Sequence, residues 1–205
     1  SGAIIVPLNA WWSGTELAYG ILDCGARFVF ADAERLARLK DLPPFVEHVF
    51  AARAANPPDG VTVLEDVIGA PAHWENLPER AMPDIALAPE DEATIFYPSG
   101  TTGAPKGALG THRSLTTNIF AAPFSNARNL LRSGAKAGSE KQRVTLIAVP
   151  FFHVIGSLSI LLPNMAAGGK LVMMRKFEPL PALELIAREK VTVTGGVPSV
   201  ATALL

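Results

Sequence analysis

The residues with the clearest chemical potential lie between Tyr97 and Gly107, in the string Tyr-Pro-Ser-Gly-Thr-Thr-Gly-Ala-Pro-Lys-Gly. Its glycines let the backbone approach a ligand closely, and successive backbone N–H groups in such a turn form an anion-binding concavity. Ser99, Thr101 and Thr102 add hydroxyl donors, and the lysine adds a mobile positive charge. The stretch therefore suits a polyphosphate.

Two other interpretations compete with this one. Most Gly/Ser/Thr clusters between strands are solvated turns, and composition alone leaves that alternative open. The Walker A loop of P-loop nucleotide-binding proteins needs Gly-Lys-Ser/Thr running into a helix. Here Pro105 offers no N–H to a phosphate, and Gly107 is a poor helix start, so a Walker A loop is disfavoured.

The ordered string raises the case for phosphate binding. Ser99 to Gly107 resembles, over nine consecutive positions, the signature loop of the adenylate-forming enzymes, which include acyl-CoA synthetases, peptide-synthetase adenylation domains and beetle luciferases. Pro98 departs from the family pattern, which more often has threonine or serine there. The resemblance implies that ATP is bound by Ser99, Gly100, Thr101, Thr102, Gly103 and Lys106.

A second stretch of interest follows a predicted strand and reads Val-Pro-Phe-Phe-His-Val-Ile-Gly over 149–156. From spacing alone, a lone histidine after a buried strand is most simply a packed or solvated residue. The stretch also resembles the Pro-x-Phe-His segment that lies beside the acyl substrate in the family. The resemblance implies that Phe152, His153 and Gly156 belong to the substrate site, with His153 orienting the carboxylate or gating the acyl pocket and Gly156 leaving room for substrate.

A third stretch, 194–199, is typical of a strand-to-helix turn, with Pro198 at the first helical position. It resembles the Val-Pro-Thr/Ser segment of the family, which lines the acyl side of the pocket. The resemblance adds Gly196 and Val197 to the predicted substrate site. Phe151, Phe152 and Val197 suggest an apolar acyl group, aliphatic or aromatic, but they do not identify the acid.

The chemistry implied by the resemblance is two-step carboxylate activation. A carboxylate attacks the α-phosphorus of MgATP and gives acyl-adenylate and pyrophosphate; a thiol, most often that of coenzyme A, then displaces AMP. Lys106, Thr102 and His153 are the predicted catalytic residues, and the Thr102 hydroxyl would also help to position Mg²⁺. The resemblance thus implies an AMP-forming acid–thiol ligase that uses ATP, Mg²⁺ and CoA. An adenylation domain that loads a carrier protein and a non-catalytic nucleotide-binding module remain alternatives.

Composition limits the partners and the location. A net charge of −1 argues against nucleic acid as a partner, because duplex binding needs a basic face. The sequence contains no uninterrupted run of about 20 apolar residues, the length that a membrane-spanning helix needs. Cys24 is the only cysteine, which excludes an intramolecular disulfide and fits a reducing cytoplasm. We expect a cytoplasmic protein with small-molecule partners; homo-oligomer formation stays open.

Strand and helix signals alternate along the chain, which predicts βαβ units and a mainly parallel β-sheet flanked by helices. By the resemblance, this is part of the large N-terminal domain of an acyl-CoA synthetase-like fold. We divide it into a first βαβ part (1–69), an irregular crossing (70–92) and a phosphate-loop and acyl-pocket part (93–205). The last part contains a polar linker at 133–143, which we expect to be mobile.

Four local predictions can be tested directly. A capping box should start a helix at Ser13 that ends near Gly25. The apolar run 3–8 reads as a buried strand, and the helix over 114–131 should be kinked or broken by Pro123. A helix over 179–190 should turn Leu183, Ile186 and Ala187 inward.

The family's later motifs, which bind adenine and ribose and supply a C-terminal lysine, have no match in this sequence. We therefore expect the chain to be a piece of a longer protein and to be catalytically silent by itself.

Overall fold

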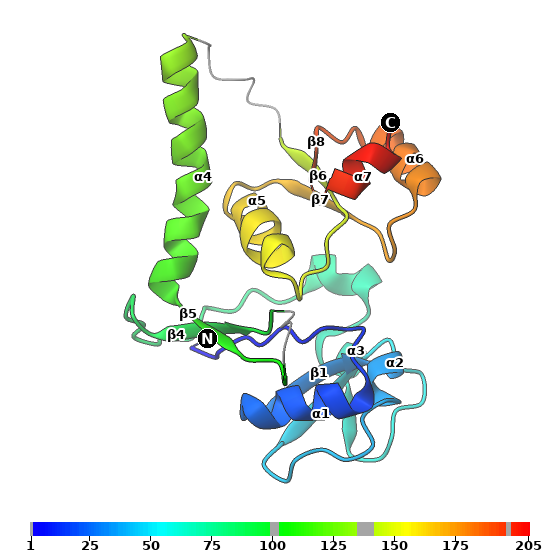
Figure 1. The fold of residues 1–205 in the computed structure, drawn as a ribbon. Helices are drawn as coiled ribbons and strands as arrows, with labels where there is room; N and C mark the ends of the chain where they lie inside the picture. Colours follow the sequence, from blue (N-terminus) through cyan, green and yellow to red (C-terminus); the bar gives the residue numbers. More distant parts are fainter. Residues whose placement is uncertain (1, 99–102, 135–141, 196–197) are drawn as a thin grey trace. The chain divides into compact units, whose positions relative to one another are not determined.

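The computed structural model describes residues 2–98, 103–134, 142–195 and 198–205. The chain divides into two units (Figure 1). The first contains Ser1–Leu87 and Ala93–Leu109, and the second contains Ala88–Glu92 and Gly110–Leu205.

The first unit contains a three-stranded parallel sheet in the order β1-β2-β3. Its core is formed by Leu36, Ala51 and Ala54. The elements of this part are α1 (Gly14–Asp23), β1 (Phe28–Asp32), α2 (Ala33–Leu36), β2 (His48–Ala52), β3 (Val61–Val63) and α3 (Leu64–Ile68). The predicted βαβ arrangement is therefore present, and β3 and α3 are additions that the sequence analysis did not predict.

Helix α1 begins as the capping box predicts. The Ser13 N–H donates to Glu16 Oε2 over 2.7 Å, and the Glu16 N–H donates to Ser13 Oγ over 3.3 Å. The helix ends before Gly25, whose φ of 62° lies in the left-handed region that glycine adopts without strain. Leu17 and Ile21 are buried, which fixes the inner face of the helix.

The predicted buried strand at 3–8 is reduced to one bridge. Ile5 pairs with Thr94 in parallel, through hydrogen bonds of 3.0 Å to Ala93 and Ile95, yet the residue is 66% exposed. The next bond of this ladder would need the N–H of residue 7, and Pro7 has none. The prediction of a buried strand is therefore wrong.

The segment that precedes the signature loop is largely irregular, as predicted. It contains one short 3₁₀ helix, η1 (Pro71–Asn76), and leads into β4 (Glu92–Phe96). Ala93, Thr94 and Phe96 are buried, so a buried strand leads into the signature loop. After the loop, β5 (Ala108–Thr111) pairs with β4 in a two-stranded sheet.

The second unit is built on a sheet in the order β7-β6-β8, in which β6 pairs in parallel with both neighbours. Its core joins Leu146 and Val172 of the sheet to Ala182 of a covering helix. The elements are α4 (His112–Ser133), β6 (Val144–Ile147), the π-helix η2 (Ile155–Leu161), α5 (Leu162–Ala166), β7 (Lys170–Met173), α6 (Pro179–Glu189), β8 (Val193–Gly195) and α7 (Pro198–Ala203). Most of the predicted linker, 135–141, lies outside the described residues.

Two helix predictions are corrected by the second unit. Helix α4 runs from His112 to Ser133 as one helix with Pro123 inside it (Figure 1), so the proline does not break the helix. Helix α6 packs through Ala182, whose small side chain allows a close approach to the sheet, and not through Leu183 or Ala187, which are exposed. Of the three predicted inward residues, Ile186 alone packs against this core. The fold class itself, parallel sheets flanked by helices, is confirmed.

Candidate functional site

The structure describes the C-terminal part of the signature loop, from Gly103 onward, and the residues up to Pro98 that precede the loop. Gly103 has a φ of 80°, in the left-handed region, and no atom of the described residues lies within 4 Å of where its side chain would be. Lys106 is exposed, and no described carboxylate forms an ion pair with its ammonium group. The other predicted phosphate-binding residues, Ser99, Gly100, Thr101 and Thr102, lie outside the described residues, so their roles stay predictions.

Tyr97, which lies just before the signature loop, is hydrogen-bonded to helix α1. The Tyr97 hydroxyl donates to Asp23 Oδ2 over 2.6 Å, and only 8% of Tyr97 is exposed. Its ring also meets Trp12 edge to face, with ring centroids 5.8 Å apart. The residue that follows β4, Tyr97, thus has both its hydroxyl group and its ring held in place.

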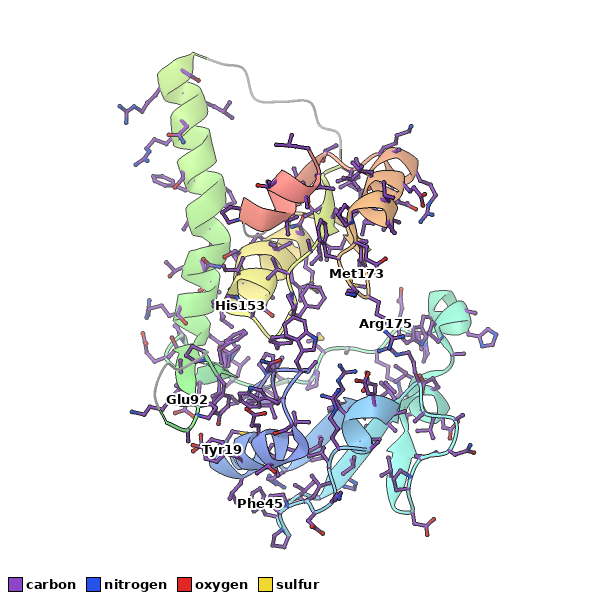
Figure 2. The ribbon with its side chains drawn as sticks, turned by 45° about the vertical axis from the view of Figure 1, so that its right-hand side comes forward. Tyr19, Phe45, Glu92, His153, Met173 and Arg175 are labelled. Atoms are coloured by element: carbon purple, nitrogen blue, oxygen red, sulfur yellow. The ribbon has the colours of Figure 1, made fainter. Side chains whose placement is uncertain are left out.

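The far side of the loop is bound to the same helix. The Tyr19 hydroxyl donates to the carbonyl oxygen of Pro105 over 3.1 Å, and it lies 3.5 Å from Asp23 Oδ1. Tyr19 and Asp23 lie one turn apart on α1, where Figure 2 labels Tyr19. One helical turn therefore reaches both flanks of the signature loop.

The Tyr19 and Tyr97 hydroxyl groups are in the protonated form that donates a hydrogen bond. Burial raises the pKa of Tyr97, and the hydrogen bond to the Asp23 carboxylate raises it further. Burial and the charge of Asp23 also raise the pKa of Tyr19. Both hydroxyls therefore keep their protons at neutral pH, while Asp23 acts as the acceptor.

Gly107 packs tightly on the other side of Lys106. A Cβ at this position would lie 2.7 Å from Ile95 Cγ2 and 3.3 Å from Tyr97 Cζ. The backbone can pass this close to β4 only without a side chain. The main chain around Lys106 is thus held by Tyr19 at Pro105 and by close packing at Gly107.

The predicted acyl-pocket residues Phe152, His153 and Gly156 lie in the second unit, after β6. His153, which Figure 2 labels, is exposed, and its Nδ1 accepts a hydrogen bond from the Ile155 N–H over 3.3 Å. A neutral ring therefore carries its proton on Nε2. The π-helix that follows is a rare element, often found at functional sites.

Gly156 has a packing role that the structure makes explicit. A Cβ there would overlap the carbonyl oxygen of Pro150 and would lie 2.8 Å from its carbonyl carbon. The glycine lets the π-helix pack against the end of the strand. Its predicted role of leaving room for substrate stays a prediction, and Gly196 and Val197 lie outside the described residues.

A buried polar pair that the sequence analysis missed supports this second stretch. Thr145 Oγ1 donates to Asn164 Oδ1 over 2.9 Å, and Asn164 Nδ2 donates to the Ile160 carbonyl over 2.7 Å. Thr145 is 2% and Asn164 4% exposed. The pair joins β6 to α5, Asn164 also joins α5 to η2, and no local pattern in the sequence indicates these contacts.

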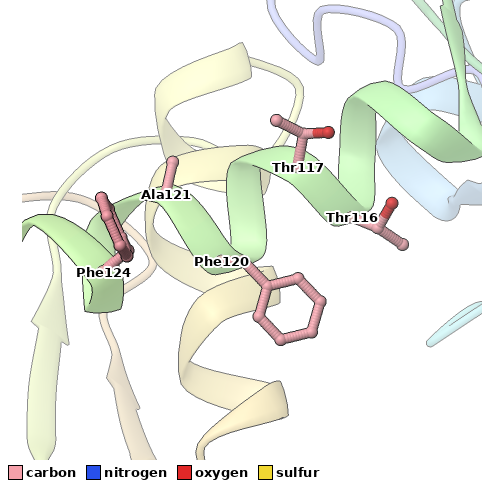
Figure 3. Close-up of a pocket in the computed structure, with 5 residues that line it drawn as sticks. All are labelled: Thr116, Thr117, Phe120, Ala121 and Phe124. Carbon is pink, nitrogen blue, oxygen red and sulfur yellow. The ribbon is translucent and has the colours of Figure 1, made fainter.

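An open hollow follows the exposed side of α4 (Figure 3). It is lined by Thr116, Thr117, Phe120, Ala121 and Phe124. It contains none of the predicted site residues, so it is not the predicted nucleotide or acyl site.

The described residues contain no group of three or more His, Cys, Asp or Glu side chains placed to hold a metal ion. They also contain no helix that is both long and apolar enough to cross a membrane.

Comparisons with known proteins all point to the same enzyme family. The family described as "AMP-binding enzyme" matches residues 1–205. The 4-coumarate–CoA ligase of Vanilla planifolia is 35% identical over 207 residues, and feruloyl-CoA synthase of an Amycolatopsis species is 28% identical over 204 residues. These matches cover 99% and 100% of this chain, but only 35% of each relative.

A solved structure reproduces the fold. The anthranilate CoA ligase AuaEII, in complex with anthranoyl-AMP, superposes with a TM-score of 0.74 over 98% of this chain and 36% of its own length. Its sequence is 23% identical, so the likeness shows the fold.

Proposed function

Because this chain belongs to the AMP-binding enzyme family, we propose that it forms part of the ATP-binding region of a longer AMP-forming acid–thiol ligase. The family match over all 205 residues carries the proposal. The exposed Lys106, held on both sides at the end of the signature loop, supports it. The activity proposed is that of the whole enzyme, since the chain spans 35% of the relatives compared.

In the first step a carboxylate oxygen of the acid attacks the α-phosphorus of ATP. The bond from this phosphorus to the bridging oxygen breaks, and pyrophosphate leaves with the electron pair. Lys106 would neutralise charge that builds up on the leaving group, with the signature-loop donors beside it. Losing one preorganised donor of this type typically lowers the rate by about 10²–10³.

Mg²⁺ would share this task by binding phosphate oxygens. The described residues offer no acidic cluster for a metal, which fits an ion that takes its ligands mainly from phosphate and water. The Thr102 hydroxyl remains our proposed protein contact.

In the second step a thiolate attacks the acyl carbonyl carbon, and AMP leaves to give a thioester. We assign this thiol to coenzyme A, because the relatives compared are a CoA ligase and a CoA synthase. His153, with Phe152 and Gly156, would line the acyl side. We also propose a cytoplasmic location, where ATP and coenzyme A are available and Cys24 stays a free thiol.

The substrate proposed is an aromatic acid of the hydroxycinnamate class. Both relatives carry such an acid in their names, and Phe151 and Phe152 supply half-buried aromatic surface beside His153. Aromatic side chains bind planar apolar rings through stacking and edge contacts.

The test uses the full-length protein with ATP, Mg²⁺ and a panel of 4-coumarate, ferulate, octanoate and acetate. We expect acid-dependent pyrophosphate release that is highest with the two aromatic acids, and AMP plus thioester once coenzyme A is added. ATP hydrolysis that ignores the acid would contradict the ligase. Adenylate formation without transfer to coenzyme A would favour a carrier-protein acceptor.

A further inference from the structure

Three side chains outside the nine-residue signature motif connect helix α1 to both flanks of the signature loop. They are Tyr19, Asp23 and Tyr97, called here the tyrosine–aspartate network. Tyr97 lies 74 residues from Asp23, and Pro105 lies 86 residues from Tyr19. Neither contact follows from chain proximity, so the network is a product of the tertiary fold.

The bond from Tyr19 acts directly on the peptide group before Lys106. The carbonyl of Pro105 and the N–H of Lys106 belong to one planar peptide unit. The proline ring fixes φ of residue 105, and the 3.1 Å bond from the Tyr19 hydroxyl fixes the direction of the carbonyl. The two constraints together set the direction in which the chain enters Lys106.

The bond between Tyr97 and Asp23 acts on the residue after Lys106. It holds the ring of Tyr97, whose Cζ and Oη would lie 3.3 Å and 3.4 Å from a Cβ at Gly107. Gly107 can therefore not move toward β4 while the ring stays bound to Asp23. The lysine is constrained on one side by a hydrogen bond and on the other by a packed ring.

We propose that the tyrosine–aspartate network is a positioning device for Lys106, which fixes the main chain on both sides of the lysine so that its ammonium is presented to the ATP phosphates in one direction. The network does not touch the substrate, so its three members are positioning residues. This inference rests on the proposed function, since it assigns Lys106 to ATP.

A simpler explanation is that these bonds only stabilise α1 against β4. Ser13 provides the matched control, because it caps the same helix at its other end. Ser13→Ala removes the acceptor of the Glu16 N–H and should lower the temperature of unfolding, without touching the loop. A loss of activity caused by a weaker helix would appear in this variant as well.

The first measurement is acid-dependent ATP–pyrophosphate exchange by the full-length protein. Tyr19→Phe keeps the ring and removes the donor; it should lower kcat/KM for ATP by about tenfold to a hundredfold, as expected for a catalytic group displaced by up to about 1 Å. Asp23→Asn keeps an acceptor and should retain more activity than Asp23→Ala. Ser13→Ala should exchange at the wild-type rate. Wild-type rates in Tyr19→Phe and Asp23→Ala would overturn the inference.

The second measurement asks whether the network acts through the lysine. MgATP dissociation constants are measured by calorimetry for wild type, Tyr19→Phe, Lys106→Ala and the double variant. We expect Tyr19→Phe to weaken binding in the wild type and to have no further effect once Lys106 is alanine. Equal effects in both backgrounds would overturn the inference.

The two proposals fail in different ways. If the wild-type protein binds MgATP but shows no acid-dependent exchange, the proposed ligase function is wrong, while the calorimetric comparison still decides the role of the network. If exchange is present and the two variants of the network leave it unchanged, the function stands and the positioning inference falls.

Discussion

The two glycines that flank Lys106 should respond oppositely to the same pair of substitutions. Gly107 is glycine because of a close contact: a Cβ would lie 2.7 Å from Ile95 Cγ2, whereas carbon atoms in contact lie about 3.5–4.0 Å apart. Gly103 is glycine because of its φ of 80°, and among the described residues no atom lies within 4 Å of its Cβ position. One position is limited by space and the other by backbone conformation.

The magnitudes follow from these two causes. Gly107→Ala must open a gap of about 1 Å between the loop and β4, and such overpacking costs about 1–3 kcal/mol. Gly103→Ala costs about 1–2 kcal/mol, the penalty of a left-handed backbone with a side chain. Asparagine tolerates that backbone better, so Gly103→Asn should cost less than Gly103→Ala. At Gly107 the larger asparagine should cost more than alanine.

Urea unfolding of the full-length protein measures all four variants. We expect the order of alanine and asparagine to reverse between the two positions. The same order at both positions, or a neutral Gly107→Ala, would refute the reasoning, because it would show that contact and conformation do not separate the two glycines.

Three further predictions concern other parts of the chain. The hydrogen bonds from Lys170 and Arg188 lower the pKa of Glu189 from 4.5 to about 2. The stability advantage of wild type over Glu189→Gln should therefore be constant above about pH 4.5 and disappear as pH falls toward 2. Thermal unfolding measured over this pH range tests it. An advantage that survives at pH 2 would contradict the pairing. Gly156→Ala should destabilise by about 3 kcal/mol in urea, because backbone atoms of Pro150 must move; a neutral effect would refute the contact. The 205 residues alone should form no acyl-adenylate detectable by mass spectrometry. A charge-assisted hydrogen bond to ATP contributes about 1.5–3 kcal/mol, whereas association costs about 4 kcal/mol or more, so the loop alone binds ATP weakly. Any adenylate would refute this prediction.

Local signals in the sequence predicted the elements well. Ser13 and Glu16 form both halves of the capping box within one turn, so the start of α1 depends on neighbours in the chain alone. The failed strand at 3–8 is also local in origin, since Pro7 removes the N–H that the next bond needs.

Tertiary features could not be predicted in the same way. The inner face of α6 is centred on Ala182 because a small residue lets the helix approach Leu146 and Val172, and the apolar pattern alone does not rank alanine above leucine. Tyr19 and Asp23 are one turn apart, which a reader of the sequence can see. Their partners Tyr97 and Pro105 are supplied by the fold.

The phosphate-binding role of Lys106 is the central claim, and one measurement tests it most directly. Acid-dependent ATP–pyrophosphate exchange is measured for the full-length wild type and for Lys106→Ala at saturating acid. The account predicts that exchange needs the acid and falls by about 10²–10³ in the variant, with the unfolding temperature unchanged. Exchange at the wild-type rate in Lys106→Ala would contradict it.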